Sequence, residues 1–374
     1  MSSKRFGVAA IVIGSVLSVF SSYARAAEFV EEIERDFPLK SIGQLHVTNM
    51  RGDVSVQGWA LDKIRIKARR KAIADTQEEA QKLFSTMDFR YRSIDGSDIE
   101  LSAEYGRGLD IQARLKERES PRTGMEMIVF APGNLKLKIS TVDGKATAKS
   151  WSAPLEIRTA AGPIVVQRVK SQSVSLLCPS CLMKIENVKA SIRCMGGTGK
   201  IELKEVRGGS VYAETSSGSI VMNTVIGEQL YVSSSGEITG KALDGRIEFH
   251  AQTAPVEINS SSGFLSGRTT SGAISAQMKR WKFSDKALIE TDSGNISLRL
   301  PFAFSGDVDI WSLEGKTEVG FPVRKLEEAA VGPQPAERFY GRVRDGGELL
   351  KLYTKFGNIR VFRGETDASA ARAE

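Results

Sequence analysis

The stretch that decides the fold is Thr215-Ser216-Ser217-Gly218-Ser219-Ile220-Val221-Met222. A short polar phrase ends at Gly218, and the apolar side chains of Ile220 and Met222 follow two and four residues later. The positions five and seven residues before the glycine are apolar as well. Because two is the side-chain period of a β-strand, each flanking segment has one apolar face. The stretch therefore predicts two strands joined by a sharp corner, where the backbone turns tightly or takes a positive φ that suits glycine.

The same phrase recurs along most of the chain at nearly constant steps. Two further corners, at Ser180 and Pro255, lack the glycine but keep its place. The last step, from Gly315 to Gly357, is about twice as long as the others, and we interpret it as two coils with an insertion inside. A fixed period of this kind is typical of repeat proteins. The repeat-turn glycines are Gly144, Gly162, Gly199, Gly218, Gly236, Gly272, Gly294, Gly315 and Gly357.

One such coil cannot bury its apolar face alone. Stacking coils at the ~4.8 Å spacing of neighbouring strands would give a continuous interior and satisfy the backbone hydrogen bonds between coils. The sequence thus predicts an all-β repeat protein: a β-solenoid, or parallel β-helix, of about ten coils of 18–22 residues. A β-sandwich of hairpins is the alternative, although a sandwich does not require one period throughout.

Residues 27–130 are expected to form an N-terminal cap of strands and one helix. The helix is predicted over 76–87, with Thr76 as its N-cap and Glu79 at the capping-box position. Such a cap would keep the terminal coil from pairing with other chains.

The repeats are predicted to occupy 131–363. Inside them, the polar segment 324–338 contains two prolines and is expected to be a loop insertion at the surface. The tail 364–374 is rich in Ala, Ser, Glu and Arg, a composition that favours disorder.

The first 26 residues have the pattern of a signal peptide. Lys4 and Arg5 precede an apolar run over 8–20, which is too short for a membrane span of ~20 residues. Small residues then predict cleavage between Ala26 and Ala27. An uncleaved anchor is the alternative, and no later run is long enough to be a transmembrane span. We expect an exported, secreted protein of the periplasm, the outer-membrane surface or the extracellular space.

The charge of the chain is modest. The formal net charge is +7, and removing Lys4, Arg5 and Arg25 with the signal peptide leaves +4. This value could favour anionic glycans or lipid headgroups, but it is not typical of a nucleic-acid partner.

The three cysteines are Cys178, Cys181 and Cys194. Because an exported protein folds in an oxidising compartment, Cys178 and Cys181 are a possible disulfide that bridges a corner. Free thiols, or a redox-active pair with a lowered thiol pKa, are the alternatives. Cys194 stands at an inward position and is expected to be buried.

The residues that carry catalysis are sparse. His46 and His250 are the only histidines, and neither is at metal-ligand spacing from the cysteines, so we expect no metal site and no cofactor. A polysaccharide-acting enzyme would need carboxylates close together, whereas Asp143, Asp244 and Asp292 stand at separate corners as turn residues. We therefore expect no enzyme activity.

Four runs of hydroxyl residues, which stand near the corners, are open to two interpretations. They could form a polar stripe that contacts a glycan or a protein, or they could be small residues that corners use. The runs are Thr215–Ser217, Ser233–Ser235, Ser260–Ser262 and Thr269–Ser271.

The segment 49–59 (NMRGDVSVQGW), the serial Ser-Ser-Gly-x-Ile units and the ending 347–359 resemble the bacterial DUF4097 family, whose members are often labelled adhesins. The resemblance covers nearly the whole mature chain, and it implies a β-helix-like fold on or near the cell envelope. It implies no catalytic residues. The Cys178–Cys181 turn and the 324–338 insertion depart from the family pattern.

These observations favour a non-catalytic, exported cell-envelope or surface binding protein, similar to an adhesin. Its partner would be an unknown envelope protein or a glycan. A periplasmic structural or regulatory scaffold is one alternative, and a polysaccharide-acting β-helix enzyme is another.

Overall fold

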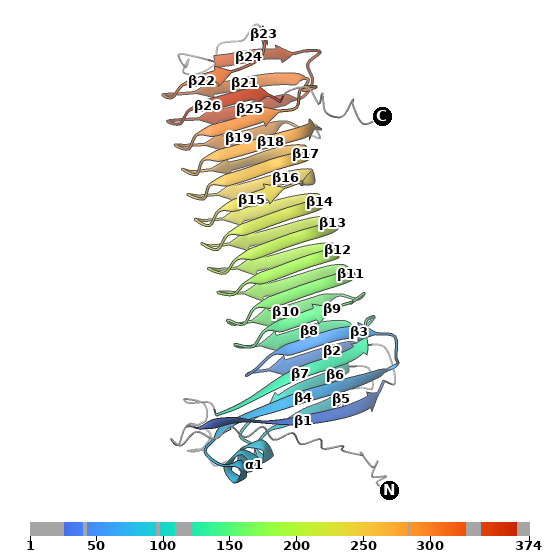
Figure 1. The fold of residues 1–374 in the computed structure, drawn as a ribbon. Coiled ribbons are helices and arrows are strands. Elements are labelled where there is room, and N and C mark those ends of the chain that lie inside the picture. The colour runs from blue at the N-terminus through green and yellow to red at the C-terminus, as the bar shows by residue number, and fades with distance from the viewer. Residues whose placement is uncertain are drawn as a thin grey trace, which may run out of the picture. The chain divides into compact units, whose positions relative to one another are not determined.

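The computed structural model describes residues 26–39, 43–94, 98–108, 122–282, 285–326 and 338–364. Residues 1–25 of the predicted signal peptide and residues 365–374 of the predicted tail lie outside the described ranges. Ala26 is the first described residue, and Ala27 begins the first strand. The cleavage site between them stays a prediction. The described part contains twenty-six strands and one helix, which confirms the all-β prediction (Figure 1). The chain forms two compact units, Met1–Cys181 and Leu182–Glu374.

The first unit contains eleven strands and the helix. They are β1 (Ala27–Pro38), β2 (Gln44–Asn49), β3 (Val54–Trp59), β4 (Lys63–Ala74), α1 (Gln77–Ser85), β5 (Asp88–Ile94), β6 (Asp98–Glu104), β7 (Thr123–Pro132), β8 (Lys136–Thr141), β9 (Ala146–Lys149), β10 (Leu155–Thr159) and β11 (Ile164–Cys178).

Antiparallel strands open the first unit. β4 pairs antiparallel with both β1 and β7, and β5 pairs antiparallel with β6. Each of β2 and β3 has a parallel partner on both sides. β2 pairs with β6 and with β8, and β3 pairs with β7 and with β9. From β8 onward the pairing is parallel and each partner belongs to the next coil, as when Leu155 pairs with Leu137 on one side and Val174 on the other.

The predicted helix is present and lies against β4 (Figure 1). The Thr76 hydroxyl accepts a hydrogen bond from the backbone N–H of Glu79 at 3.2 Å. The Glu79 carboxylate accepts its return bond from the N–H of Asp75 rather than from the N-cap residue. This bond and the neighbouring Arg122 lower the pKa of Glu79. Ala80 and Phe84 form the buried side of the helix.

The second unit contains fifteen strands. They are β12 (Met183–Gly196), β13 (Ile201–Thr215), β14 (Ile220–Ser233), β15 (Ile238–Lys241), β16 (Asp244–Ala251), β17 (Val256–Thr269), β18 (Ile274–Trp281), β19 (Ala287–Thr291), β20 (Ile296–Leu300), β21 (Gly306–Ser312), β22 (Thr317–Val319), β23 (Arg324–Lys325), β24 (Arg338–Val343), β25 (Leu349–Thr354) and β26 (Ile359–Arg363).

Parallel pairing dominates the second unit, where strands from successive coils lie side by side (Figure 1). The sequence separation between paired residues of neighbouring coils is 17 to 19 up to β18. It rises to 22 between β17 and β19 and between β18 and β20. The inward side chains of these strands are buried and mostly aliphatic, as the period of two predicts. A glycine fits where a large inward neighbour needs room: a Cβ on Gly267 would meet the Phe249 ring at 2.6 Å.

The end of the chain is not stacked in sequence order. β25 and β26 insert between two earlier coils, pairing with β19 and β20 on one side and with β21 and β22 on the other. The interpretation of the step from Gly315 to Gly357 as two successive coils is therefore wrong, since strands at the two ends of this step are direct neighbours. Part of the predicted 324–338 loop is strand: β23 pairs antiparallel with β24, which pairs antiparallel with β21. Residues 327–337 lie outside the described ranges.

A second type of corner has no glycine signature. Its residues have φ between 52° and 59° and recur once in each of seven successive coils. Left-handed backbone at non-glycine residues is uncommon, and for the β-branched Thr224 it is an outlier. Stacked coils must stabilise this conformation, because the local sequence disfavours it. These residues are Ser150 and Arg168 in the first unit, and Asn187, Glu205, Thr224, Ala242 and Ser260 in the second.

Candidate functional site

The corner glycines are required by close backbone contact rather than by a positive φ. Where the contact is described, an added Cβ would lie 1.9 to 2.2 Å from a backbone oxygen of the neighbouring coil. None of the nine predicted glycines is among those with positive φ. The glycines with this contact are Gly144, Gly162, Gly218, Gly236, Gly272, Gly294, Gly315 and Gly357. Gly199 supplies the oxygen that the Cβ of Gly218 would meet.

The two corners without glycine are shifted by one residue from their predicted places. A Cβ on Gly272 would meet the oxygen of Ala254, so Ala254 rather than Pro255 occupies that corner. The register of β12 with β13 pairs Met183 with Ile201, and it brings Cys181 rather than Ser180 to the place of Gly199. Small buried side chains therefore replace glycine at both corners.

Cys178 and Cys181 form a disulfide, with Cα atoms 5.7 Å apart. The Cys178 sulfur also accepts a hydrogen bond from the backbone N–H of Cys181. Cys194 is a free, buried cysteine, and burial raises its thiol pKa to about 12. Because the thiolate is the reactive form, this residue behaves as a small apolar side chain.

We expect the disulfide to add little stability, because it closes a very short loop. Replacing both Cys178 and Cys181 by serine should lower the free energy of unfolding by about 2 kcal/mol or less. Urea unfolding of the variant, compared with the wild type with and without reductant, measures the difference. A loss of the native fold in the reduced protein would contradict a purely local staple.

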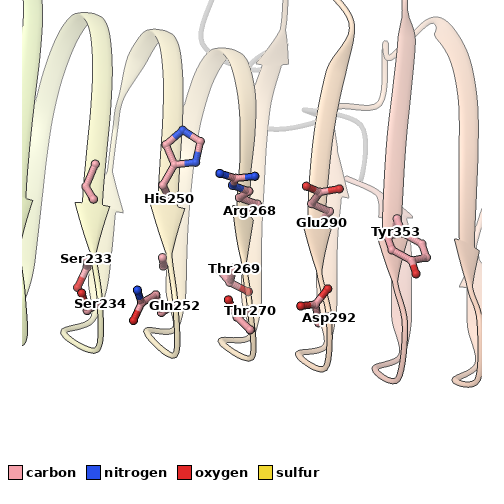
Figure 2. Close-up of a pocket in the computed structure, with 12 residues that line it drawn as sticks. Ser233, Ser234, His250, Gln252, Arg268, Thr269, Thr270, Glu290, Asp292 and Tyr353 are labelled. Atoms are coloured by element: carbon pink, nitrogen blue, oxygen red, sulfur yellow. The ribbon is translucent and has the colours of Figure 1, made fainter.

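The second unit has an open groove of about 430 Å³. It crosses the outward faces of β14, β16, β17, β19 and β25 where these strands approach the glycine corner (Figure 2). Two parallel rows of side chains form its surface. The row four residues before the corner is Val232, His250, Arg268, Glu290 and Tyr353; the row two residues before it includes Ser234, Gln252, Thr270 and Asp292.

The strand register sets the order of the first row. His250 is paired with Arg268, Arg268 with Glu290, and Glu290 with Tyr353, so each is on the strand next to the other. Figure 2 shows His250, Arg268 and Glu290 side by side on adjacent strands. The second row is held by backbone hydrogen bonds from Thr270 N–H to Gln252 and from Asp292 N–H to Thr270.

The charged side chains in the first row of the groove have no partner within the described residues. No hydrogen bond or ion pair engages the side chains of His250, Arg268 or Glu290 there, although opposite charges are on neighbouring strands. Some charged residues on other outward positions of the unit do pair. Arg246 donates to Glu248 at 2.6 Å, and Lys200 lies 2.6 Å from Glu202. The groove thus exposes a set of donors and acceptors that the protein itself does not use.

An aromatic pair ends the groove. The ring of Tyr353 packs on Trp311 with centroids 4.4 Å apart and a tilt of 49°. This contact holds the Tyr353 ring in one place, and Tyr353 lines the groove. Tyr212, which is outside the groove, donates to Glu214 at 2.6 Å. Trp151 is buried and donates to the Leu135 carbonyl at 2.8 Å.

The hydroxyl runs divide between the two interpretations. Thr215, Ser233 and Thr269 are buried, and their hydroxyls hydrogen-bond corner backbone groups at 2.6 to 3.0 Å. Ser234 and Thr270 line the groove instead. The run Ser260–Ser262 is at the positive-φ corner, so it does not belong to the same stripe.

The carboxylates are closer together than the sequence suggested. Asp292 is not an isolated turn residue, because Glu290 lies two positions away on the same outward face of the groove. Asp143 and Asp244 are not part of this groove. Within the described ranges, no group of three or more His, Cys, Asp or Glu residues is placed to hold a metal ion.

His46 is far from the groove in sequence and has a local role. Its Nε2 is 3.3 Å from the Ser140 hydroxyl and 3.2 Å from that of Thr48. Burial, and then the charge of Lys138, lower its pKa. None of the described helices is both long and apolar enough to cross a membrane.

Sequence reasoning missed Arg268, Gln252, Glu290 and Tyr353. Each is an ordinary outward residue of its own coil. The available signal was the alignment of coils on their corners: the positions four and two residues before each corner collect the two rows. When the corner is placed at Ala254 instead of Pro255, His250 is four residues before it and so belongs to the first row.

No protein-family model and no curated protein match the chain. Three crystal structures resemble it weakly, and their names are provisional. A cell adhesion protein from Clostridium sporogenes is 8% identical, with 90% of this chain and 100% of that chain covered and a TM-score of 0.23. An adhesin from Bacteroides fragilis is 12% identical and a lipid binding protein from Parabacteroides distasonis 15%, each covering 71% of this chain and 96% of its own, with TM-scores of 0.31 and 0.32. At such scores we take neither fold nor function from them, and the resemblance to the DUF4097 family stays a prediction.

Proposed function

We propose that the chain is an exported β-solenoid that binds a component of the cell envelope without chemical turnover, as an adhesin does. The parallel registers, which link each coil to the next at a nearly constant separation, and the buried inward rows support the solenoid. The signal-peptide pattern of the first 26 residues supports export to the periplasm, the outer-membrane surface or the extracellular space.

One observation carries the binding function. The groove presents charged, amide and hydroxyl side chains that have no partner within the described residues. Elsewhere in the same unit, Arg246 pairs with Glu248 and Lys200 with Glu202, so charged side chains of this surface can form ion pairs within the protein. A preformed concave surface with convergent polar groups is the usual form of a binding site. Donors and acceptors without a partner in the protein can replace their hydrogen bonds to water by hydrogen bonds to a ligand. No hydrogen bond inside the protein has to break first.

The test is to obstruct the groove without disturbing the core. Thr270 is exposed and lines the groove, and Ser275 is also exposed, on β18 outside the groove. Thr270→Arg and Ser275→Arg add the same charge and bulk at these two places. We expect the mature wild-type chain to cosediment with isolated envelopes of the cells that produce it. Thr270→Arg should weaken this binding about tenfold or more, while Ser275→Arg stays close to the wild type.

Two results would contradict the proposal. One is that the wild-type chain does not cosediment with envelopes. The other is that the two arginine variants bind equally, since the groove would then have no role. Protease digestion of intact and permeabilised cells adds the location: cleavage on intact cells indicates a surface protein, and protection until permeabilisation indicates a periplasmic one.

The second candidate is a polysaccharide-acting enzyme, favoured by the position of Glu290 and Asp292 on one face of the groove. Two carboxylates in one groove are the minimum that glycoside hydrolysis requires. The two roles separate in a reducing-end assay on the bound envelope glycan. Release of new ends by the wild type but not by Glu290→Gln would replace the binding role with a catalytic one.

A further inference from the structure

The charges in the groove are ordered along its length. His250 and Arg268 are on β16 and β17, and Glu290 follows on β19. Each step to the next paired strand is about 4.8 Å. The groove therefore has a cationic part and an acidic part that adjoin at Arg268 and Glu290. A ligand that lies in the groove crosses the strands and meets a different side chain at every step.

The floor of the groove excludes recognition by main-chain pairing. It is the face of a parallel sheet, whose backbone groups are already bonded to the neighbouring strands. A bound peptide normally adds to a free sheet edge through its own backbone. Here the ligand must be read by side chains alone, which favours a molecule that is rich in hydroxyl groups along its whole length.

The side chains match such a molecule. Gln252, Thr270 and Asp292 offer an amide, a hydroxyl and a carboxylate. They form the second row of the groove, beside the row of His250, Arg268 and Glu290. These groups donate to and accept from sugar hydroxyls. Tyr353, held by Trp311 at 4.4 Å, gives the apolar face of a sugar ring a flat surface to lie on.

Arg268 adds a requirement for negative charge. Its guanidinium has no carboxylate partner in the described structure, and its fixed fork of donors matches a carboxylate with two parallel hydrogen bonds. His250 is on the next strand and is a second donor for the same group. A neutral sugar would leave the Arg268 charge without a counterpart.

We propose that the groove binds a linear glycan that carries carboxylate groups, with one carboxylate held by Arg268. This inference rests on the proposed binding function and names its ligand class. Gln252, Thr270 and Asp292 bind the hydroxyls of the chain, and one of its rings lies on Tyr353.

The test is titration calorimetry of the mature chain with hexamers of galacturonate and of mannuronate. The fully methyl-esterified hexamers have the same backbone without the charge. We expect binding of at least one acidic hexamer and about tenfold or weaker binding of its ester. Arg268→Ala should weaken the acidic hexamer about 10- to 100-fold, and Arg268→Lys less, because it keeps the charge and loses the fork. Tyr353→Ala should cost about tenfold.

The matched control is Arg299→Ala. Arg299 is an exposed arginine on β20, outside the groove, and its removal changes the net charge by the same amount. Its affinity should stay within about twofold of the wild type. Equal binding of acid and ester, or equal losses in the two arginine variants, would overturn the inference. Binding of hexaglutamate as tightly as the acidic hexamers would also overturn it, since the ligand would then be an acidic peptide.

The failures of the two proposals are distinguishable. A wild-type chain that cosediments with envelopes but binds neither acidic hexamer overturns the ligand class and leaves the binding function standing. A chain that binds neither envelopes nor hexamers overturns both.

Discussion

Replacing Gly218 by valine is expected to lower the free energy of unfolding by at least about 4 kcal/mol. The Cβ of any residue at this position would lie 1.9 Å from the oxygen and 2.5 Å from the carbon of the Gly199 carbonyl. Both neighbours are backbone, so no side chain can move aside. The coil must shift away from its partner, and the shift breaks the hydrogen bonds between β13 and β14 on either side of the corner.

The control for this prediction is Gly209→Val. Gly209 is exposed, and an added Cβ there would meet only the Ser191 hydroxyl at 3.5 Å. Its cost should be about 1 kcal/mol or less. Thermal unfolding followed by circular dichroism, together with limited proteolysis, measures both variants. Gly218→Ala should fall between them, because Ala254 shows that one corner accepts a methyl group. A Gly218→Val protein as stable as Gly209→Val would refute the close-contact explanation.

The strands and glycine corners were predictable because their cause is local. An inward residue at every second position, interrupted by a residue without a side chain, leaves a direct trace in the sequence. The glycine at position 218 was also assigned a second possible cause, a positive φ, which the backbone does not have. The actual cause is the approach of Gly199, which can be inferred only when the neighbouring coil is in place.

Features that depend on stacking left no local trace. Thr224 and Ala242 take a left-handed backbone that their own side chains disfavour, so nothing in the sequence marks that corner. The groove also leaves no mark in the sequence of any single coil. Arg268 and Glu290 belong to different coils, and only the register of β17 with β19 brings them to neighbouring strands. A candidate site of this kind appears when coils are aligned on their corners, and it is missed when residues are weighed one at a time.

The order of the last coils was the largest error of the sequence analysis, and it has a physical consequence. A repeat protein is expected to stack in chain order, since each unit folds against the one before it. Here the coil of β21 and β22 precedes the coil of β25 and β26 in sequence but lies beyond it in the stack. Among the described residues between them, β23 and β24 form an antiparallel pair.

Deleting residues 346–374 should therefore disrupt far more than a terminal segment. The deletion removes four buried aliphatic side chains, at about 1.5–3 kcal/mol each. The corresponding loss is about 6–12 kcal/mol, which is comparable with the whole stability of a typical domain. The four residues are Leu350, Leu352, Ile359 and Val361.

The deletion also leaves strands on both sides of the gap unpaired. β19 and β20 lose the partners that cover their edge, and β21 and β22 lose their only parallel neighbours in the described structure. Exposed parallel edges with apolar inward faces pair readily with other chains. We expect the truncated protein to aggregate, with soluble yield and the temperature of unfolding both sharply reduced.

Two companion variants separate the inserted coil from chain length. Deleting only residues 365–374 shortens the chain without touching a described strand, and it should leave the unfolding temperature unchanged. Leu352→Glu keeps the full length but places a charge at a fully buried position between Ile289 and Ile310, so it should reproduce most of the loss. If the protein without 346–374 unfolds like the wild type, the coil of β21 and β22 can move down by one place and pair directly with β19 and β20. The inserted coil would then be dispensable for stability, and its place between two earlier coils would not be a fixed feature of the native pairing.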